Sequence, residues 1–257
     1  MKFRNLAVLV AALAAAVPFA SATPISYTLG STGSAGISGY APTVTVSNSA
    51  MSYVGSSTYA TVPAIPASPG PLVGQAGTSF TTTGAGTAVD LNPLTTWIPP
   101  IANSSWVGIN STAGPVNTVN PAYGYYEFQT TFTAVAGTYS GYLDVLADDT
   151  TEVLLNGTLI PGLSLGSLGG DSHCADGQPN CSAQDTDFLT VSLLGGVNTL
   201  TFVVEQAGTQ GPGGSSNPSG VDFAGVLTAT PEPNSLILLG TGLLGAAGLL
   251  FRKRITS

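Results

Sequence analysis

The stretch Tyr126-Glu127-Phe128-Gln129-Thr130-Thr131-Phe132 decides the fold, because aromatic and polar side chains alternate along it. Successive side chains of a β-strand point to opposite faces, so the alternation predicts one face of rings turned to a core and one polar face turned to water. A similar alternation returns in 139–147 and 198–205. No segment between Thr23 and Ala229 shows helical periodicity. The chain is therefore predicted to be all-β, with a jelly-roll-like β-sandwich as its folded passenger.

Short glycine-containing links separate the predicted strands. Ala136-Gly137 joins two of them, Asn156-Gly157 follows the strand at 152–155, and Gly195-Gly196 precedes the strand at 198–205. Asn-Gly tolerates positive φ at both positions, which a two-residue hairpin turn requires. The first link is predicted to join adjacent strands, and the other two to form hairpins.

The sequence divides the exported part into two regions. Residues 23–96 are rich in Gly, Ser, Thr and Pro, with short β-prone runs, so their order stays open. Residues 97–229 carry the clearer strand pattern and are predicted to form the β-sandwich domain. Within them, the pieces 126–132, 147–157 and 198–204 resemble the galactose-binding-like β-sandwich. Modules of that superfamily often bind glycans, and many others are purely structural.

The N-terminus has the three parts of a secretory signal peptide. Positive charge at Lys2 and Arg4 precedes an apolar stretch, and Ala20-Ser21-Ala22 is a small-residue cleavage site. Residues 1–22 are therefore predicted to be removed on export, which makes Thr23 the first residue of the mature chain.

The C-terminal region 230–257 also has three parts. Pro231-Glu232-Pro233 comes first, an uncharged Leu- and Gly-rich stretch follows, and Arg252-Lys253-Arg254 closes it. A helix over 234–251 approaches the roughly 30 Å thickness of a hydrocarbon core, so a single transmembrane helix is predicted there. The basic triplet is expected to stay in the cytoplasm. A buried helix of a soluble domain is the alternative.

These three parts together resemble the PEP-CTERM sorting signal of Gram-negative bacteria. The resemblance implies recognition by an exosortase-type membrane enzyme, cleavage near Pro231-Glu232-Pro233, and a setting of exopolysaccharide or biofilm production. It implies export across the inner membrane, anchoring there with a cytoplasmic C-terminus, and then a place at the cell surface or outside the cell. The resemblance covers the tail and does not say what the rest of the chain binds.

The charge distribution excludes one class of partner. All five Lys and Arg residues lie in the two terminal signals. The chain has thirteen Asp and Glu residues, and all of them except Glu232 lie within 23–230. Nucleic-acid affinity depends on Lys and Arg meeting phosphates, so nucleic-acid binding is excluded. An acidic surface is repelled by anionic membranes for the same reason.

Cys174 and Cys181 are predicted to form a disulfide, because an exported chain meets an oxidising compartment. A metal site that includes His173 is the alternative, although the spacing of the three residues matches no common zinc pattern.

Asp148 and Asp149 form the centre of the densest carboxylate cluster, with Asp144 and Glu152 close by. Calcium takes six to eight oxygen ligands, so the cluster is a candidate calcium site. The chain is nevertheless expected to need no cofactor. An Asp-rich turn whose carboxylates accept backbone N–H bonds is the favoured alternative. A second acidic group near the cysteines has the same two interpretations, and consists of Asp171, Asp176, Asp185 and Asp187.

Trp97 and Trp106 stand at the start of the better patterned region. If exposed, they would stack on sugar rings of a polysaccharide, and if buried they are ordinary core residues. Paired carboxylates also suggest a glycoside hydrolase, but the chain has one His, no Lys or Arg to orient an anion, and none of the common catalytic motifs. A non-catalytic adhesion or glycan-binding module is favoured, with a polysaccharide hydrolase or a structural coat protein as alternatives.

Overall fold

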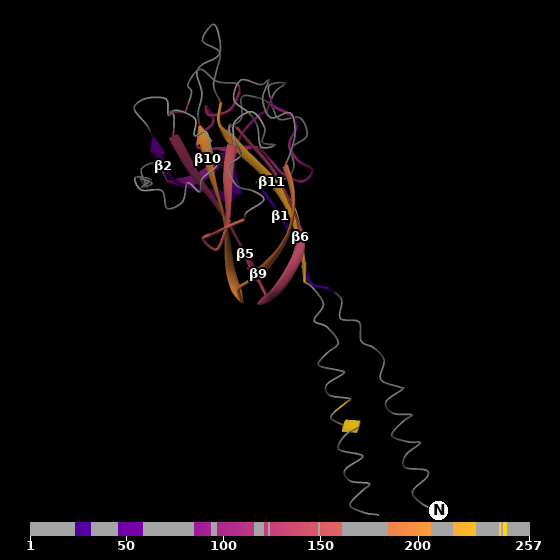
Figure 1. Cartoon of the computed structure of the whole chain (residues 1–257). Helices are drawn as coiled ribbons and strands as arrows, with labels where there is room; N and C mark the ends of the chain where they lie inside the picture. The colour runs from indigo at the N-terminus through magenta and orange to yellow at the C-terminus, as the bar shows by residue number, and fades with distance from the viewer. Residues whose placement is uncertain are drawn as a thin grey trace, which may run out of the picture. The chain divides into compact units, whose positions relative to one another are not determined.

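The computed structural model describes most of the predicted strands, and Ser26–Ala229 form one compact unit (Figure 1). The described residues are 24–31, 46–58, 85–93, 97–115, 121–122, 124–148, 150–160, 185–206, 218–229, 242 and 244–245.

All regular elements described in this unit are β-strands. In chain order they are β1 (Ser26–Gly30), β2 (Val46–Thr58), β3 (Gly86–Asp90), β4 (Val107–Gly108), β5 (Gly124–Ala134), β6 (Gly137–Asp148), β7 (Thr150–Leu155), β8 (Thr158–Leu159), β9 (Asp185–Leu193), β10 (Gly196–Gln206) and β11 (Gly220–Ala229).

The strands pair antiparallel in the order β8-β7-β10-β5-β2-β3-β4-β11-β6-β9, and β1 pairs with β11 off this path. The sheet curls so that β5 and β10 face β1, β6 and β11 (Figure 1). Ring contacts join the two layers, since the Phe202 and Phe223 centroids are 4.5 Å apart and Tyr27 lies 6.2 Å from Phe132. The predicted all-β class and β-sandwich are confirmed.

The alternation in β5 is confirmed at the level of burial. Tyr126 and Phe128 are 3% and 1% exposed and belong to the main core, whereas Thr131 and Thr133 on the opposite face are exposed. Burial of the aromatic face stabilises the strand because apolar surface leaves water.

Two of the three predicted links between strands differ from the prediction. Asn156-Gly157 does form the β7–β8 hairpin, with φ of 52° and 77°. However, β5 pairs with β10 and β2 but not with β6, and β9 pairs with β6 but not with β10. The short links after β5 and after β9 therefore cross from one layer to the other. A glycine-rich link allows either path, and the core decides between them.

The described parts of 23–96 join the same sheet. β1 pairs with β11, β2 with β5, and β3 with β2 and β4. The boundary predicted between 96 and 97 thus falls inside the compact unit.

The terminal signals belong to a second unit, 1–25 with 230–257, and lie mostly outside the described residues. The signal peptide with its cleavage site at Ala20, Ala22 and Thr23, the sorting motif and the basic triplet are all outside. Of the predicted span 234–251, residues 242, 244 and 245 are described and are helical. Within the described part of the chain, no helix is long and apolar enough to cross a membrane.

Candidate functional site

Four neighbouring strands place one row of side chains on the outer face of the sandwich. Thr28 on β1 is paired with Val226 on β11, Val226 with Tyr142 on β6, and Tyr142 with Phe188 on β9. Directly paired residues project from the same face of a sheet. These four residues form a continuous row across the strands, and we call it the aromatic row.

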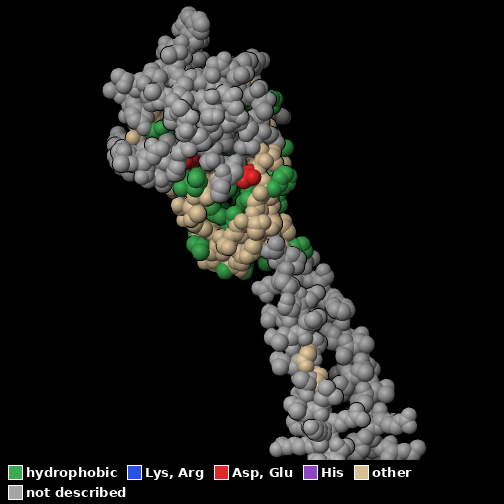
Figure 2. Space-filling model, viewed as in Figure 1, with side chains coloured by type: hydrophobic (Ala, Val, Ile, Leu, Met, Phe, Trp, Pro, Cys, Tyr) green, Lys and Arg blue, Asp and Glu red, His purple; other side chains and the backbone are tan. Residues whose placement is uncertain are grey.

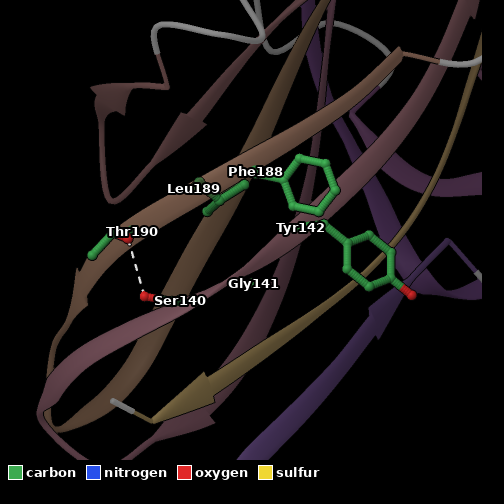
Figure 3. A pocket seen from close by; sticks show the side chains of 6 residues that line it. All are labelled: Ser140, Gly141, Tyr142, Phe188, Leu189 and Thr190. Carbon is green, nitrogen blue, oxygen red and sulfur yellow. Dashed lines mark hydrogen bonds between the residues drawn. The ribbon is translucent and has the colours of Figure 1, made fainter.

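The two rings of the aromatic row are open to solvent. Phe188 is 81% exposed and Tyr142 is 37% exposed, although most large apolar side chains of the unit are buried. Figure 3 shows the two rings next to each other, projecting from adjacent strands. They border a shallow depression of about 420 Å³, which is lined by Ser140, Gly141, Tyr142, Phe188, Leu189 and Thr190. The exposed pair of rings on adjacent paired strands forms an apolar platform.

Polar side chains flank the platform on the same strands. The hydroxyls of Ser140 and Thr190 are 3.0 Å apart on one side (Figure 3). On the other side, Thr186 Oγ1 donates a hydrogen bond to Asp144 Oδ1. Hydroxyl and carboxylate oxygens beside an apolar ring suit a ligand that combines apolar C–H surface with hydroxyl groups.

The rest of this outer face is covered by the segment between β3 and β5. Trp97 and Trp106 are 2% and 0% exposed, and their rings stack with centroids 4.3 Å apart in a small core that includes Leu146 of β6. Trp106 Nε1 donates to the Ile98 carbonyl oxygen at 3.1 Å. The two tryptophans close the face beyond Asp144 and leave the aromatic row open.

Burial removes the two tryptophans from contact with a polysaccharide. Sugar stacking needs an exposed ring face, and Trp97 and Trp106 cover each other and the sheet. They are core residues, the second of the two interpretations that the sequence allowed. The exposed rings are instead Tyr142 and Phe188.

The carboxylate of Asp148 has a structural partner. It is 6% exposed, and Trp97 Nε1 donates to its Oδ2 at 2.6 Å. Asp149 lies outside the described residues, as do His173, Cys174 and Cys181. Among the residues that are described, no three His, Cys, Asp or Glu side chains come together as a metal site would require. The calcium site and the disulfide stay predictions.

A buried polar network ties the covering segment to the sheet. Asp222 on β11 is 0% exposed and accepts hydrogen bonds from Ser31 Oγ at 2.6 Å and from the Ile101 backbone N at 2.8 Å. Asn48 Nδ2 donates to Asp90 Oδ1 at 2.6 Å and to the Ser31 carbonyl oxygen at 2.7 Å. Burial raises the pKa of the Asp222 carboxyl above its ordinary value of 3.8, although the hydrogen bonds it accepts offset part of this rise.

This raised pKa predicts the sign of a pH effect. Between about 3.8 and the higher pKa in the fold, the folded chain keeps the Asp222 proton that the unfolded chain has lost. The free energy of unfolding should therefore fall as pH rises through that window. In Asp222→Asn, the free energy of unfolding should decrease less over the same pH range. Urea unfolding of both proteins between pH 3 and 7 measures the difference. Parallel pH profiles would contradict the assignment.

The comparisons with known proteins identify the tail. Residues 229–254 match the PEP-CTERM protein-sorting motif, in agreement with the predicted signal. The motif marks the chain for export and for membrane-anchored sorting toward the cell surface. No curated protein matches the chain.

Several solved structures are similar to part of the chain. A family 35 carbohydrate-binding module from Clostridium thermocellum is 12% identical, over 51% of this chain and 82% of that one, with a TM-score of 0.29. The CBM35 from Paenibacillus barcinonensis is 16% identical, over 54% and 88%, with a TM-score of 0.29. A β-glucosidase from Kluyveromyces marxianus is 19% identical, over 44% and 12%, with a TM-score of 0.27. These scores are too low to transfer a ligand or a residue role.

The sequence does contain a signal for the aromatic row, which the prediction of strands alone did not use. Tyr142 stands in phase with Ser140 and Asp144, and Phe188 in phase with Thr186 and Thr190. Each is an aromatic residue on the polar side of its strand, where no core requires it.

Proposed function

We propose that this protein is an exported cell-surface or matrix protein that binds polysaccharide without cleaving it. The single observation that carries the proposal is the exposure of Phe188 beside Tyr142, on a face where hydroxyl groups and the Asp144 carboxylate flank the two rings. Aromatic rings pack against the apolar face of a sugar, while the neighbouring oxygens bond to its hydroxyls. The row runs across four strands, so it suits an extended chain of sugars.

The charge of the exported part favours a neutral polysaccharide. Between residues 23 and 230 there is no Lys or Arg, so nothing there offers a fixed cation to a uronic acid, a sulfate or a phosphate. Acidic polymers would instead meet like charge, which weakens association. We infer that the ligand is a neutral glycan of the surrounding exopolysaccharide.

The open face supports binding more than hydrolysis. Glycoside hydrolysis generally uses two carboxyl groups on either side of the scissile bond. On the part of this face that is described and not covered, Asp144 is the one carboxylate, and Thr186 already donates a hydrogen bond to it.

The sorting motif supplies the setting of the proposal. We infer that the chain crosses the inner membrane of a Gram-negative bacterium and is held there by 234–251 with its C-terminus in the cytoplasm. An exosortase-type enzyme then cuts near Pro231-Glu232-Pro233, and the β-sandwich passes to the cell surface or the biofilm matrix.

Replacing Phe188 by alanine should weaken binding to a neutral polysaccharide at least tenfold, which is about 1.4 kcal/mol. The ring is 81% exposed, so its loss should change the free energy of unfolding little. Retardation of 23–229 in native gels that contain β-glucan, galactan or xylan measures the affinity, and an alginate gel tests the preference for neutral chains.

Val197→Ala is the matched control, because Val197 is 64% exposed and lies away from the aromatic row. It should bind as the wild type does. Equal retardation of Phe188→Ala and wild type would contradict the assigned face. No retardation of the wild type in any gel would favour the structural coat protein.

A further inference from the structure

One end of the compact unit carries three exposed aliphatic side chains. The β5–β6 and β9–β10 links lie side by side there, because β5 pairs with β10 and β6 pairs with β9. Val135 and Leu194, in these links, are both 57% exposed, and Val197 at the start of β10 is 64% exposed. These three residues form the apolar tip. Exposed aliphatic side chains gathered at one place mark a contact surface more often than single ones do.

The described strand ends here carry no charged side chain. Among the described residues of β5, β6, β9, β10 and β11, the nearest charged side chain is Asp187, six positions from Leu193. At about 3.3 Å per residue, this separates charge from the tip by about 20 Å along the strand. In Figure 2 the visible carboxylates lie away from the green and tan end of the unit.

The chain leaves the unit at this end. β11 finishes at Ala229, which pairs with Tyr139 close to the start of β6. The predicted membrane span starts at 234, so only 230–233 lie between them. Five Cα steps reach at most about 18 Å. A chain anchored through its sorting signal therefore cannot hold this end far from the bilayer.

We propose that the apolar tip contacts the surface of the lipid bilayer while the sorting signal anchors the chain. The proposal rests on the membrane-anchored part of the proposed function and is independent of glycan binding. Three aliphatic side chains without a neighbouring Lys or Arg would enter the lipid boundary by burial of apolar surface. The carboxylates at the far end stay away from anionic headgroups, which would repel them.

A second copy of the chain fits the tip less well than a bilayer does. Stable protein interfaces bury about 1,200–2,000 Å² in total, far more than three side chains provide. The contact would hold Pro231-Glu232-Pro233 at the level of the lipid headgroups, within reach of a membrane-embedded processing enzyme.

The test places an indole at the tip of the full chain. Leu194→Trp is reconstituted into phosphatidylcholine vesicles with or without bromine on the upper part of the acyl chains, since bromine quenches an indole that it touches. We expect bromine to remove roughly half of the added fluorescence, because interfacial side chains lie about 5–10 Å into the headgroup and acyl boundary. Wild type supplies the background of the two buried tryptophans, and Val135→Trp repeats the test if Leu194→Trp does not fold.

Ser111→Trp is the matched control at the opposite end. Ser111 is exposed in a turn beside Ala113, whose carbonyl oxygen accepts a bond from Ser219 just before β11 begins. Its indole should be unquenched. Equal quenching at both ends, or no quenching at the tip, would overturn the proposal. If the unquenched tip indole is also shielded from acrylamide, a second copy of the chain covers the tip instead of lipid.

A longer link between β11 and the predicted membrane span distinguishes affinity of the apolar tip for lipid from mere closeness to the bilayer. Six Gly and Ser residues inserted after Thr230 should leave the quenching of Leu194→Trp in place, whereas its loss would show that the tip has no affinity of its own and would overturn the proposal. Phe188→Ala should not change the quenching. A protein that binds no glycan can therefore still pass this test, and a protein that fails it can still bind glycan.

Discussion

Gly141→Ala is expected to lower the free energy of unfolding by roughly 3–5 kcal/mol, at the upper end for one substitution. A Cβ at this position would overlap the Val226 carbonyl oxygen, and a Cβ at Gly225 would lie 2.6 Å from the Tyr142 carbonyl oxygen. The obstructing atoms are backbone atoms, so no side chain can rotate away. β6 and β11 would have to separate where they carry the aromatic row. Urea unfolding followed by circular dichroism measures the loss.

Gly137→Ala is the matched control on the same strand. Its Cβ would meet Tyr139 Cε2 at 3.6 Å, an ordinary van der Waals contact. The free energy of unfolding should stay within about 1 kcal/mol of wild type, or rise slightly because alanine restricts the unfolded chain. If the two variants unfold at the same urea concentration, then the close approach of β6 and β11 is not what requires glycine at 141.

Trp106→Ala should lower the free energy of unfolding by about 3–5 kcal/mol, the usual range for a fully buried large aromatic residue. The substitution removes a side chain that is 0% exposed, its stack on Trp97, and its hydrogen bond to the Ile98 carbonyl oxygen. Polysaccharide binding by the folded fraction should be unchanged. Urea unfolding measures the change in stability, and native gel retardation measures binding. Both experiments are run at a temperature below the thermal unfolding midpoint of the variant.

Trp106→Ala and Phe188→Ala form a reciprocal pair. The first should affect stability and spare binding, and the second should affect binding and spare stability. Lost binding in Trp106→Ala without lost stability would return the sugar-stacking role to the tryptophans that the sequence suggested. Similar effects of both variants on both measurements would show that the covering segment and the aromatic row act as one site.

The class of fold was predictable because strand alternation is a local property. The polar and aromatic phases of 126–132 are enough to place Tyr126 and Phe128 in a core, and the structure buries both. The hairpin at Asn156-Gly157 was predictable for the same reason, since positive φ at both residues defines the turn.

The path of the chain between layers was not predictable from its turns. Ala136-Gly137 and Gly195-Gly196 have the composition of hairpin links, yet each carries the chain across the core. What decides the crossing is the pairing of β5 with β10 and of β6 with β9, which joins residues 40 to 82 positions apart. No short stretch of sequence contains that information.

The candidate site was also only partly predictable, because the exposure of its residues depends on strands distant in the sequence. Tryptophan is a common sugar-stacking residue, but whether Trp97 and Trp106 are exposed depends on the distant strand β6, whose Leu146 lies in their core. Tyr142 and Phe188 were visible as aromatic residues on polar strand phases. Their pairing into one platform, however, depends on the register between β6 and β9.

The pairing of β11 with β6 along its whole length also determines how this protein would bear a mechanical load. Under the proposed function, a bound polymer would pull on β6 and β9, while the anchor would hold the chain at Ala229, the end of β11. Force then acts along β11, and antiparallel hydrogen bonds run perpendicular to the strands. The ladder is loaded in shear, so its bonds share the tension and must break together. An adhesive module tethered in this way resists detachment better than one whose anchored strand can be peeled away one bond at a time.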